Sequence, residues 1–106
     1  MKDLFLSVVI PCYNEEKNLR KGLLNEVAQY LRKQSYTYEV LVVDDGSSDK
    51  SSQLIEEFIK NNLNFFLVKN PHLGKAGTII AGMLKAKGEY ILFSDEAGIT
   101  HNDSIR

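Results

Sequence analysis

Cysteine is nearly absent from this 106-residue sequence, which contains Cys12 and no other. A single cysteine cannot form a disulfide within the chain, and without partner cysteines it cannot build a structural zinc site. This composition fits a reducing compartment such as the cytosol. The sequence also lacks any run of about 18 apolar residues, so we expect no membrane-spanning helix in it. Its net charge of −1 provides no strong positive field to attract nucleic acid.

Hydrophobic residues make up 43% of the chain and charged residues 25%, which is ordinary for a folded domain and argues against disorder. The length predicts one domain with a single core. Four short runs rich in Val, Ile and Phe are typical of strands that are buried on both faces of a parallel sheet. These runs are Phe5–Ile10, Glu39–Val43, Phe65–Val68 and Tyr90–Phe93.

Three amphipathic stripes at helical spacing separate these runs. The stripes consist of Leu19, Leu23, Val27, Tyr30 and Leu31; of Leu54, Ile55, Phe58 and Ile59; and of Ala76, Ile79, Ile80, Met83 and Leu84. Pro11 is predicted to end the first strand. Asn14 is predicted to cap the first helix, with the carboxylates of Glu15 and Glu16 at the positive end of the helix dipole.

Alternating strands and helices predict an α/β fold of the Rossmann-like type. Right-handed crossovers require a parallel sheet with helices on both faces, and a switch point in the middle gives the strand order 3-2-1-4. Ligands of such folds bind at the carboxyl ends of the strands. The loops that follow the strands are therefore the places to search for functional residues.

The loops after the first two strands carry residues that turn chemistry does not fully explain. In the first of these loops, Pro11 is explained by the end of a strand and Asn14 by the start of a helix. Neither role requires an aromatic side chain at Tyr13. Asp44 and Asp45 stand together after the second strand. One carboxylate can hold the loop while the other accepts an N–H from a base such as uracil or guanine. The alternative is a capped turn with no further role.

The loop at residues 72–78 contains residue types that can bind an anion, and the loop at residues 94–98 contains residue types that can bind a cation. Gly74 and Lys75 open a helix whose free N–H groups and dipole favour phosphate. We interpret His72 as a solvated loop residue rather than a metal ligand. Asp95 and Glu96 follow the last strand and provide the oxygen ligands that Mg²⁺ or Mn²⁺ prefers, with a polar turn as the alternative.

Four segments of the sequence, taken in order, resemble the successive motifs of family 2 glycosyltransferases of the GT-A type. The segments are SVVIPCYNE, VLVVDDGSSD, GKAGTIIAGMLKAKG and YILFSDEAG. The similarity runs from about Leu6 to Ala97 and is nearest to the branch of dolichyl-phosphate mannose synthases and polyprenyl-phosphate hexosyltransferases. It implies the nucleotide-binding half of a GT-A fold.

The resemblance also implies a role for individual residues. Those expected to bind the nucleotide sugar are Pro11, Tyr13, Glu15, Val43, Asp45, Lys75, Asp95 and Glu96. Asp45 corresponds to the carboxylate that recognises the base, and Lys75 to a lysine near the diphosphate. Asp95 corresponds to the first aspartate of the family's Asp-x-Asp motif, which holds the metal, and is the expected catalytic residue. Ala97 replaces the second aspartate, which leaves the dependence on Mg²⁺ or Mn²⁺ open.

The implied reaction is inverting transfer from a UDP- or GDP-sugar to an acceptor such as a polyprenyl phosphate or a glycan. Catalytic domains of this family are roughly twice as long as this chain. Residues 1–106 are therefore expected to form a single nucleotide-sugar-binding domain that stops before the acceptor half. The missing half, or an oligomer, is the expected protein partner. The full-length protein is expected in the cytoplasm, at the cytoplasmic face of a membrane.

Two other functions remain as alternatives. The first is a non-catalytic module that binds nucleotide sugars on the same fold, or an inactive fragment. The alanine at position 97 and the short chain both favour it. A phosphoacceptor domain similar to response regulators would use Asp44 or Asp45. We disfavour it because such domains do not carry the loops at residues 72–78 and 94–98 in this order.

Overall fold

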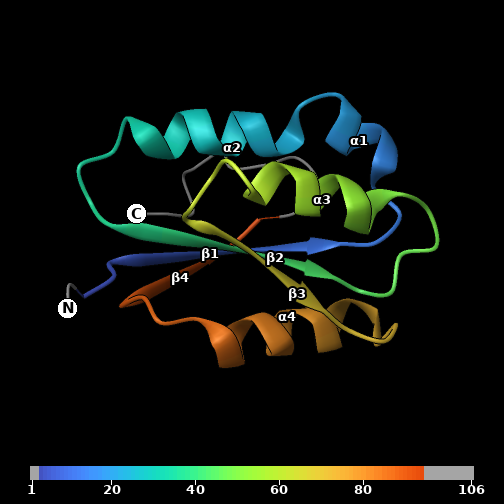
Figure 1. The fold of residues 1–106 in the computed structure, drawn as a ribbon. Helices are drawn as coiled ribbons and strands as arrows, with labels where there is room; N and C mark the ends of the chain where they lie inside the picture. The colour runs from blue at the N-terminus through green and yellow to red at the C-terminus, as the bar shows by residue number, and fades with distance from the viewer. Residues whose placement is uncertain (1–2, 95–106) are drawn as a thin grey trace.

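The computed structural model describes residues 3–94 of the chain. These residues form one four-stranded parallel sheet with the strand order β3-β2-β1-β4, which confirms the predicted order (Figure 1). The strands are β1 (Leu6–Cys12), β2 (Tyr38–Asp44), β3 (Phe65–Lys69) and β4 (Tyr90–Phe93). Because all four strands are parallel, their carboxyl ends lie at the same edge of the sheet.

Helices cover both faces of the sheet, as predicted. They are α1 (Glu16–Arg20), α2 (Leu23–Arg32), α3 (Ser51–Ile59) and α4 (Gly74–Lys85). Helices α1, α2 and α3 lie on one face, and α4 lies alone on the other (Figure 1). None of these helices is long and apolar enough to cross a bilayer.

The first helical stripe belongs to two helices, where one was expected. The break lies at Gly22, whose φ of 96° is left-handed and unsuited to other residues. Asn14 was also predicted wrongly as the N-cap of α1, since that position is Glu15. The side-chain oxygen of Asn14 instead accepts hydrogen bonds from the backbone N–H groups of Ser48 and Asp49. Asn14 therefore joins two loops that are far apart in the sequence.

Pro11 does not end β1, which continues beside β2 to Cys12. It affects the pairing with β4 instead. The last pair on that side is Val9 with Phe93, and Ser94 N donates to Val9 O at 2.9 Å. Pro11 has no N–H with which to extend this ladder. The β1–β4 pairing therefore stops short of the end of β1, while the β1–β2 pairing continues.

Most of the core lies between the sheet and the helices α2 and α3. On the other face, Val9, Leu41 and Val43 form a smaller cluster under α4. The predicted buried stripe of α4 was wrong: Thr78 and Gly82 are its buried residues, whereas the stripe's Ile80, Met83 and Leu84 are exposed. A methyl group at Gly82 would collide with the side chain of Val9, so close packing against the sheet selects the face with small residues.

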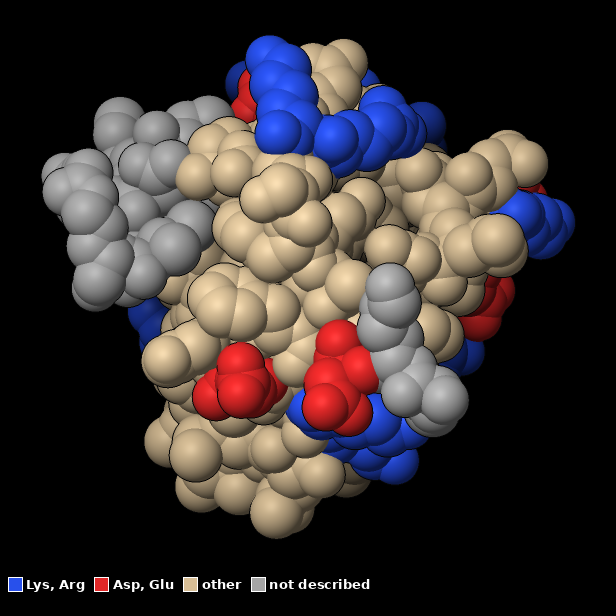
Figure 2. Space-filling view, turned by 90° about the vertical axis from the view of Figure 1, so that its left-hand side faces the viewer, with Lys and Arg blue, Asp and Glu red and all other residues tan. Residues whose placement is uncertain are grey.

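The amino ends of the strands form the opposite end of the molecule. Figure 2 shows this end, where Lys and Arg side chains lie along the upper edge, acidic side chains lie on the lower half beside further Lys and Arg side chains, and the surface between them is largely uncharged. Here the ring of Phe5 contacts those of Tyr36 and Tyr90, with centroid distances of 5.1 Å in both pairs. These aromatic contacts close the core away from the carboxyl ends, where the candidate site lies.

Candidate functional site

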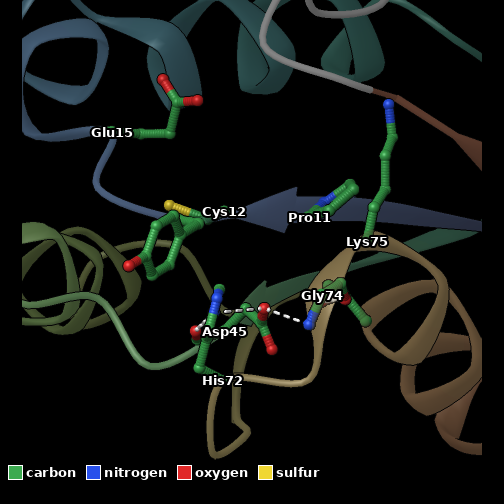
Figure 3. Close-up of a pocket in the computed structure, with 9 residues that line it drawn as sticks. Pro11, Cys12, Glu15, Asp45, His72, Gly74 and Lys75 are labelled. Carbon is green, nitrogen blue, oxygen red and sulfur yellow. Dashed lines mark hydrogen bonds and ion pairs between the residues drawn. The ribbon is translucent and has the colours of Figure 1, made fainter.

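A cavity of about 250 Å³ opens at the carboxyl ends of the central strands (Figure 3). Its lining comes from three segments: the end of β1 with the loop that follows it, the loop after β2, and the region where α4 begins. The lining residues are Pro11, Cys12, Tyr13, Glu15, Asp45, His72, Gly74, Lys75 and Thr78. The cavity thus brings together most of the residues selected from three of the four sequence segments.

Asp45 is the buried acidic group of this cavity, with a relative exposure of 3%. Its carboxylate accepts hydrogen bonds from the backbone N–H groups of Leu73 at 2.7 Å and Gly74 at 2.9 Å. Burial by itself would raise the pKa of Asp45, but these hydrogen bonds, aided by Thr78 and His72, hold it below its ordinary value. Asp45 is therefore ionised at neutral pH and fixes the start of α4.

The two adjacent aspartates have different surroundings. Asp44 accepts a hydrogen bond from the hydroxyl of Ser47 and does not line the cavity, whereas Asp45 does.

The start of α4 was expected to offer free N–H groups to phosphate. Two N–H groups at this point, those of Leu73 and Gly74, are bonded to Asp45 instead. A protein carboxylate thus already occupies part of the predicted anion site.

Serine and aspartate side chains that follow β2 hold the loop after β1 in place. The hydroxyl of Ser47 accepts the N–H of Asn14 and that of Ser51 accepts the N–H of Glu15, both at 2.8 Å. Asp49 accepts the N–H of Glu16 at 3.2 Å. Ser47, Asp49 and Ser51 were not among the residues selected from the sequence. Their partners lie more than 30 positions away, so no local pattern could have revealed these contacts.

Tyr13 and His72 form an aromatic pair at the wall of the cavity. Their ring centroids are 4.4 Å apart and the ring planes differ by 28°. His72 Nδ1 lies 3.0 Å from a carboxylate oxygen of Asp45 and 3.1 Å from its backbone oxygen. The interpretation of His72 as a solvated loop residue was therefore incomplete. Although its side chain is 58% exposed, it contacts two cavity residues from different loops.

Lys75 and Glu15 lie on opposite sides of the cavity, and both side chains extend away from Asp45 (Figure 3). Lys75 belongs to the first turn of α4 and makes no salt bridge within residues 3–94. Glu15 accepts a hydrogen bond from the side-chain amide of Asn18 at 2.6 Å. The cavity therefore has a positive side chain at one side and carboxylates at two other places.

The remaining predicted residues do not line the described cavity. Val43 is fully buried in the cluster under α4 and is not among the lining residues. Asp95, Glu96 and Ala97 lie outside the described residues, so their predicted contact with a metal and a sugar diphosphate stays a prediction. Within residues 3–94, no three His, Cys, Asp or Glu side chains are close enough to hold a metal ion.

Cys12 lines the cavity but is only 3% exposed. Burial, together with the negative charges of Asp44 and Glu15, raises the pKa of its thiol to about 12. Because the thiolate is the reactive form, we expect the folded chain to react with iodoacetamide at pH 8 about a thousandfold more slowly than a free cysteine. Mass spectrometry over time measures this rate, and the chain in urea provides the control. Rapid labelling of the folded chain would contradict the expectation.

Comparison with known proteins places the chain in a family. Residues 7–103 match the model of glycosyl transferase family 2. The chain is 40% identical over 108 residues to dolichyl-phosphate beta-glucosyltransferase ALG5A of Trichomonas vaginalis, covering 96% of this chain and 33% of that protein. The chain thus spans about a third of the length of this relative.

Solved structures show the same fold. The S. aureus TarS 1-349 structure in complex with UDP-GlcNAc superimposes with a TM-score of 0.70 at 30% identity, over 96% of this chain and 30% of that one. The mannosyltransferase PcManGT from Pyrobaculum calidifontis, in complex with GDP-Man and Mn²⁺, has a TM-score of 0.72 at 24% identity, over 91% and 28%. With its parallel sheet of order 3-2-1-4, the chain has the GT-A fold and belongs to glycosyltransferase family 2.

Proposed function

We propose that this chain forms the nucleotide-binding part of an inverting glycosyltransferase that uses a UDP- or GDP-sugar. One observation carries the proposal: the ionised carboxylate of Asp45 faces a cavity that has an aromatic ring, Tyr13, at its wall and a lysine, Lys75, at one side. A nucleoside diphosphate has matching parts, namely a flat base that donates an N–H and an anionic diphosphate. Family membership supports the same conclusion.

The base is the part of the nucleotide that Asp45 selects. Uracil and guanine each present a ring N–H to an acceptor, and a carboxylate that is held ionised accepts such a bond strongly. Cytosine presents an acceptor nitrogen at the corresponding ring position, which Asp45 would repel. We therefore place the base beside Asp45 and Tyr13, and the ribose toward Pro11 and Glu15.

The diphosphate is then expected on the side of Lys75, where the ammonium group stabilises the charge of the leaving nucleoside diphosphate. Residues 3–94 supply no complete set of metal ligands. A divalent cation would therefore be held by Asp95, assisted by Glu96 and by the diphosphate. When bound, such a cation also stabilises the charge of the leaving group. The fold neighbour that contains GDP-Man and Mn²⁺ supports Mn²⁺ as the cation to test first.

For the acceptor, we propose a polyprenyl phosphate, as the name of the Trichomonas vaginalis relative suggests. A phosphate oxygen is already anionic and needs little help from a general base. The reaction would take place at the cytoplasmic face of a membrane, where the lipid tail of the acceptor is anchored. Residues for the acceptor would come from the part of the full-length relatives that this chain does not match.

Isothermal titration calorimetry with UDP, GDP, CDP and uridine, with and without Mn²⁺, tests the proposal. We expect UDP or GDP to bind more tightly than CDP. Replacing Lys75 with alanine should weaken UDP binding about tenfold and leave uridine binding unchanged, because the lost group faces the diphosphate. Lys85→Ala, at the last turn of the same helix, is the matched control. Absence of binding by all four ligands, or equal weakening for UDP and uridine, would refute this assignment.

A further inference from the structure

His72 holds its ring in contacts that resemble those of a bound nucleobase. The imidazole stacks on the ring of Tyr13, with centroids 4.4 Å apart. The edge of the imidazole points its Nδ1 at the carboxylate of Asp45, 3.0 Å away (Figure 3). A base that stacks on Tyr13 and donates an N–H to Asp45 would use the same two groups.

The carboxylate of Asp45 leaves little room for the imidazole of His72 and a nucleobase at the same time. One oxygen accepts Leu73 N, and the other accepts Gly74 N and lies beside His72 Nδ1. The two backbone donors are fixed by the start of α4. The imidazole is the exposed partner of this carboxylate, and both side chains line the cavity.

The His72 side chain can leave this position by rotation alone. It is 58% exposed, and its one hydrogen-bonding partner within residues 3–94 is Asp45. The backbone is more constrained, because a methyl group placed on Gly46 would lie 2.9 Å from the backbone nitrogen of His72. The close approach of these two backbone segments favours a turn of the side chain over a movement of the loop.

We propose that His72 occupies the nucleobase position while the site is empty and must rotate away before a nucleotide binds. This inference rests on the proposed nucleotide-binding function. The ring of His72 competes with the base for Tyr13 and Asp45, so the apparent affinity is reduced by the fraction of molecules in which the position is filled. His72 is thus a residue that sets the affinity of the site for a nucleotide.

NMR spectroscopy of the chain with and without UDP tests this proposal directly. The sequence contains two histidines, so few imidazole signals are present, and the His72→Ala spectrum assigns those of His72. Stacking on Tyr13 should shift them upfield in the free chain. Adding UDP should return them toward the position of an exposed histidine. Calorimetry should show that His72→Ala binds UDP about three- to tenfold more tightly than the unchanged chain.

Each result separates the two proposals. If the unchanged chain binds UDP but His72→Ala binds it equally or less tightly, the competition is refuted and the nucleotide site stands. Further upfield movement of the His72 signals on adding UDP would also refute it, because the ring would then stack on the base. If neither protein binds UDP or GDP, the proposed function fails, and this inference fails with it. Leu84→Ala, on the exposed side of α4, is the control and should match the unchanged chain.

Discussion

Replacing Asp45 with alanine is expected to lower the free energy of unfolding by about 3 kcal/mol and to abolish nucleotide binding. The carboxylate is buried and accepts two backbone N–H groups at the start of α4. Without this carboxylate, the two N–H groups lose their charged acceptor, and a base in the cavity loses the acceptor for its own N–H. Urea unfolding measures the first effect, and calorimetry with UDP and GDP under native conditions measures the second.

The contribution of Asp45 to stability should depend on pH. Its pKa in the folded chain lies below its ordinary value, because hydrogen bonds from Leu73, Gly74 and Thr78 and the nearby His72 outweigh the opposing effect of burial. The stabilisation is therefore present above the pKa of the unfolded chain, and it is lost as the pH falls through the folded pKa. Below about pH 4, the difference in stability between the unchanged chain and Asp45→Asn should become smaller.

Asp49→Ala is the matched control for Asp45→Ala. Asp49 also accepts two backbone N–H groups, from Glu16 and Ser51, but it does not line the cavity. Hydrogen bonds, chiefly from Ser51, hold its pKa below the ordinary value against the effect of burial. We expect this variant to lose stability while its folded fraction keeps most of its nucleotide binding, because Asp49 supports the loop after β1 without lining the cavity. Unchanged nucleotide binding by Asp45→Ala would contradict the assigned role of Asp45.

The Gly46→Ala substitution should destabilise the chain by about 3 kcal/mol and also weaken nucleotide binding. Gly46 has a φ of 77°, which costs other residues about 1–2 kcal/mol. The added methyl group would also lie 2.9 Å from the backbone nitrogen of His72. Because backbone atoms cannot rotate away as a side chain can, the segment that carries His72 must shift, which disturbs the wall of the cavity.

Gly22→Ala separates the cost of backbone strain from the steric collision. Gly22 also has a left-handed φ, of 96°, but the nearest atom to its added methyl group would be 3.9 Å away, in Asn25. We expect this variant to lose about 1–2 kcal/mol and to bind nucleotide normally, since it lies outside the cavity. Thermal or urea unfolding of both variants makes the comparison. Equal losses at the two positions would show that the contact between Gly46 and His72 is unimportant.

The sequence by itself determined the arrangement of the sheet. Continuous apolar runs identify the four strands, but burial on both faces was predicted correctly only for β1 and β2, since Phe66 of β3 and Ile91 and Phe93 of β4 are exposed at the edges of the sheet. Right-handed crossovers require a parallel sheet, and a switch point in the middle gives the order observed. The position of Asp45 also follows from the sequence, because a residue directly after a central parallel strand must lie at the carboxyl edge of the sheet, where ligands of such folds bind. These predictions depend on local patterns and on general rules of chain connection, so they need no knowledge of individual contacts.

Tertiary structure alone decided which side chains meet at that edge. Asn14 binds the next loop rather than capping α1, and His72 stacks on Tyr13 from a segment almost 60 residues away. Asp45 bonds to the start of α4, which the sequence had left free for phosphate. Local patterns report periodicity and turn chemistry within a few residues. Contacts between loops depend on the distance between the helices and the sheet. At Gly82 the helix α4 lies so close to Val9 that a methyl group would not fit, and only the folded chain determines this distance.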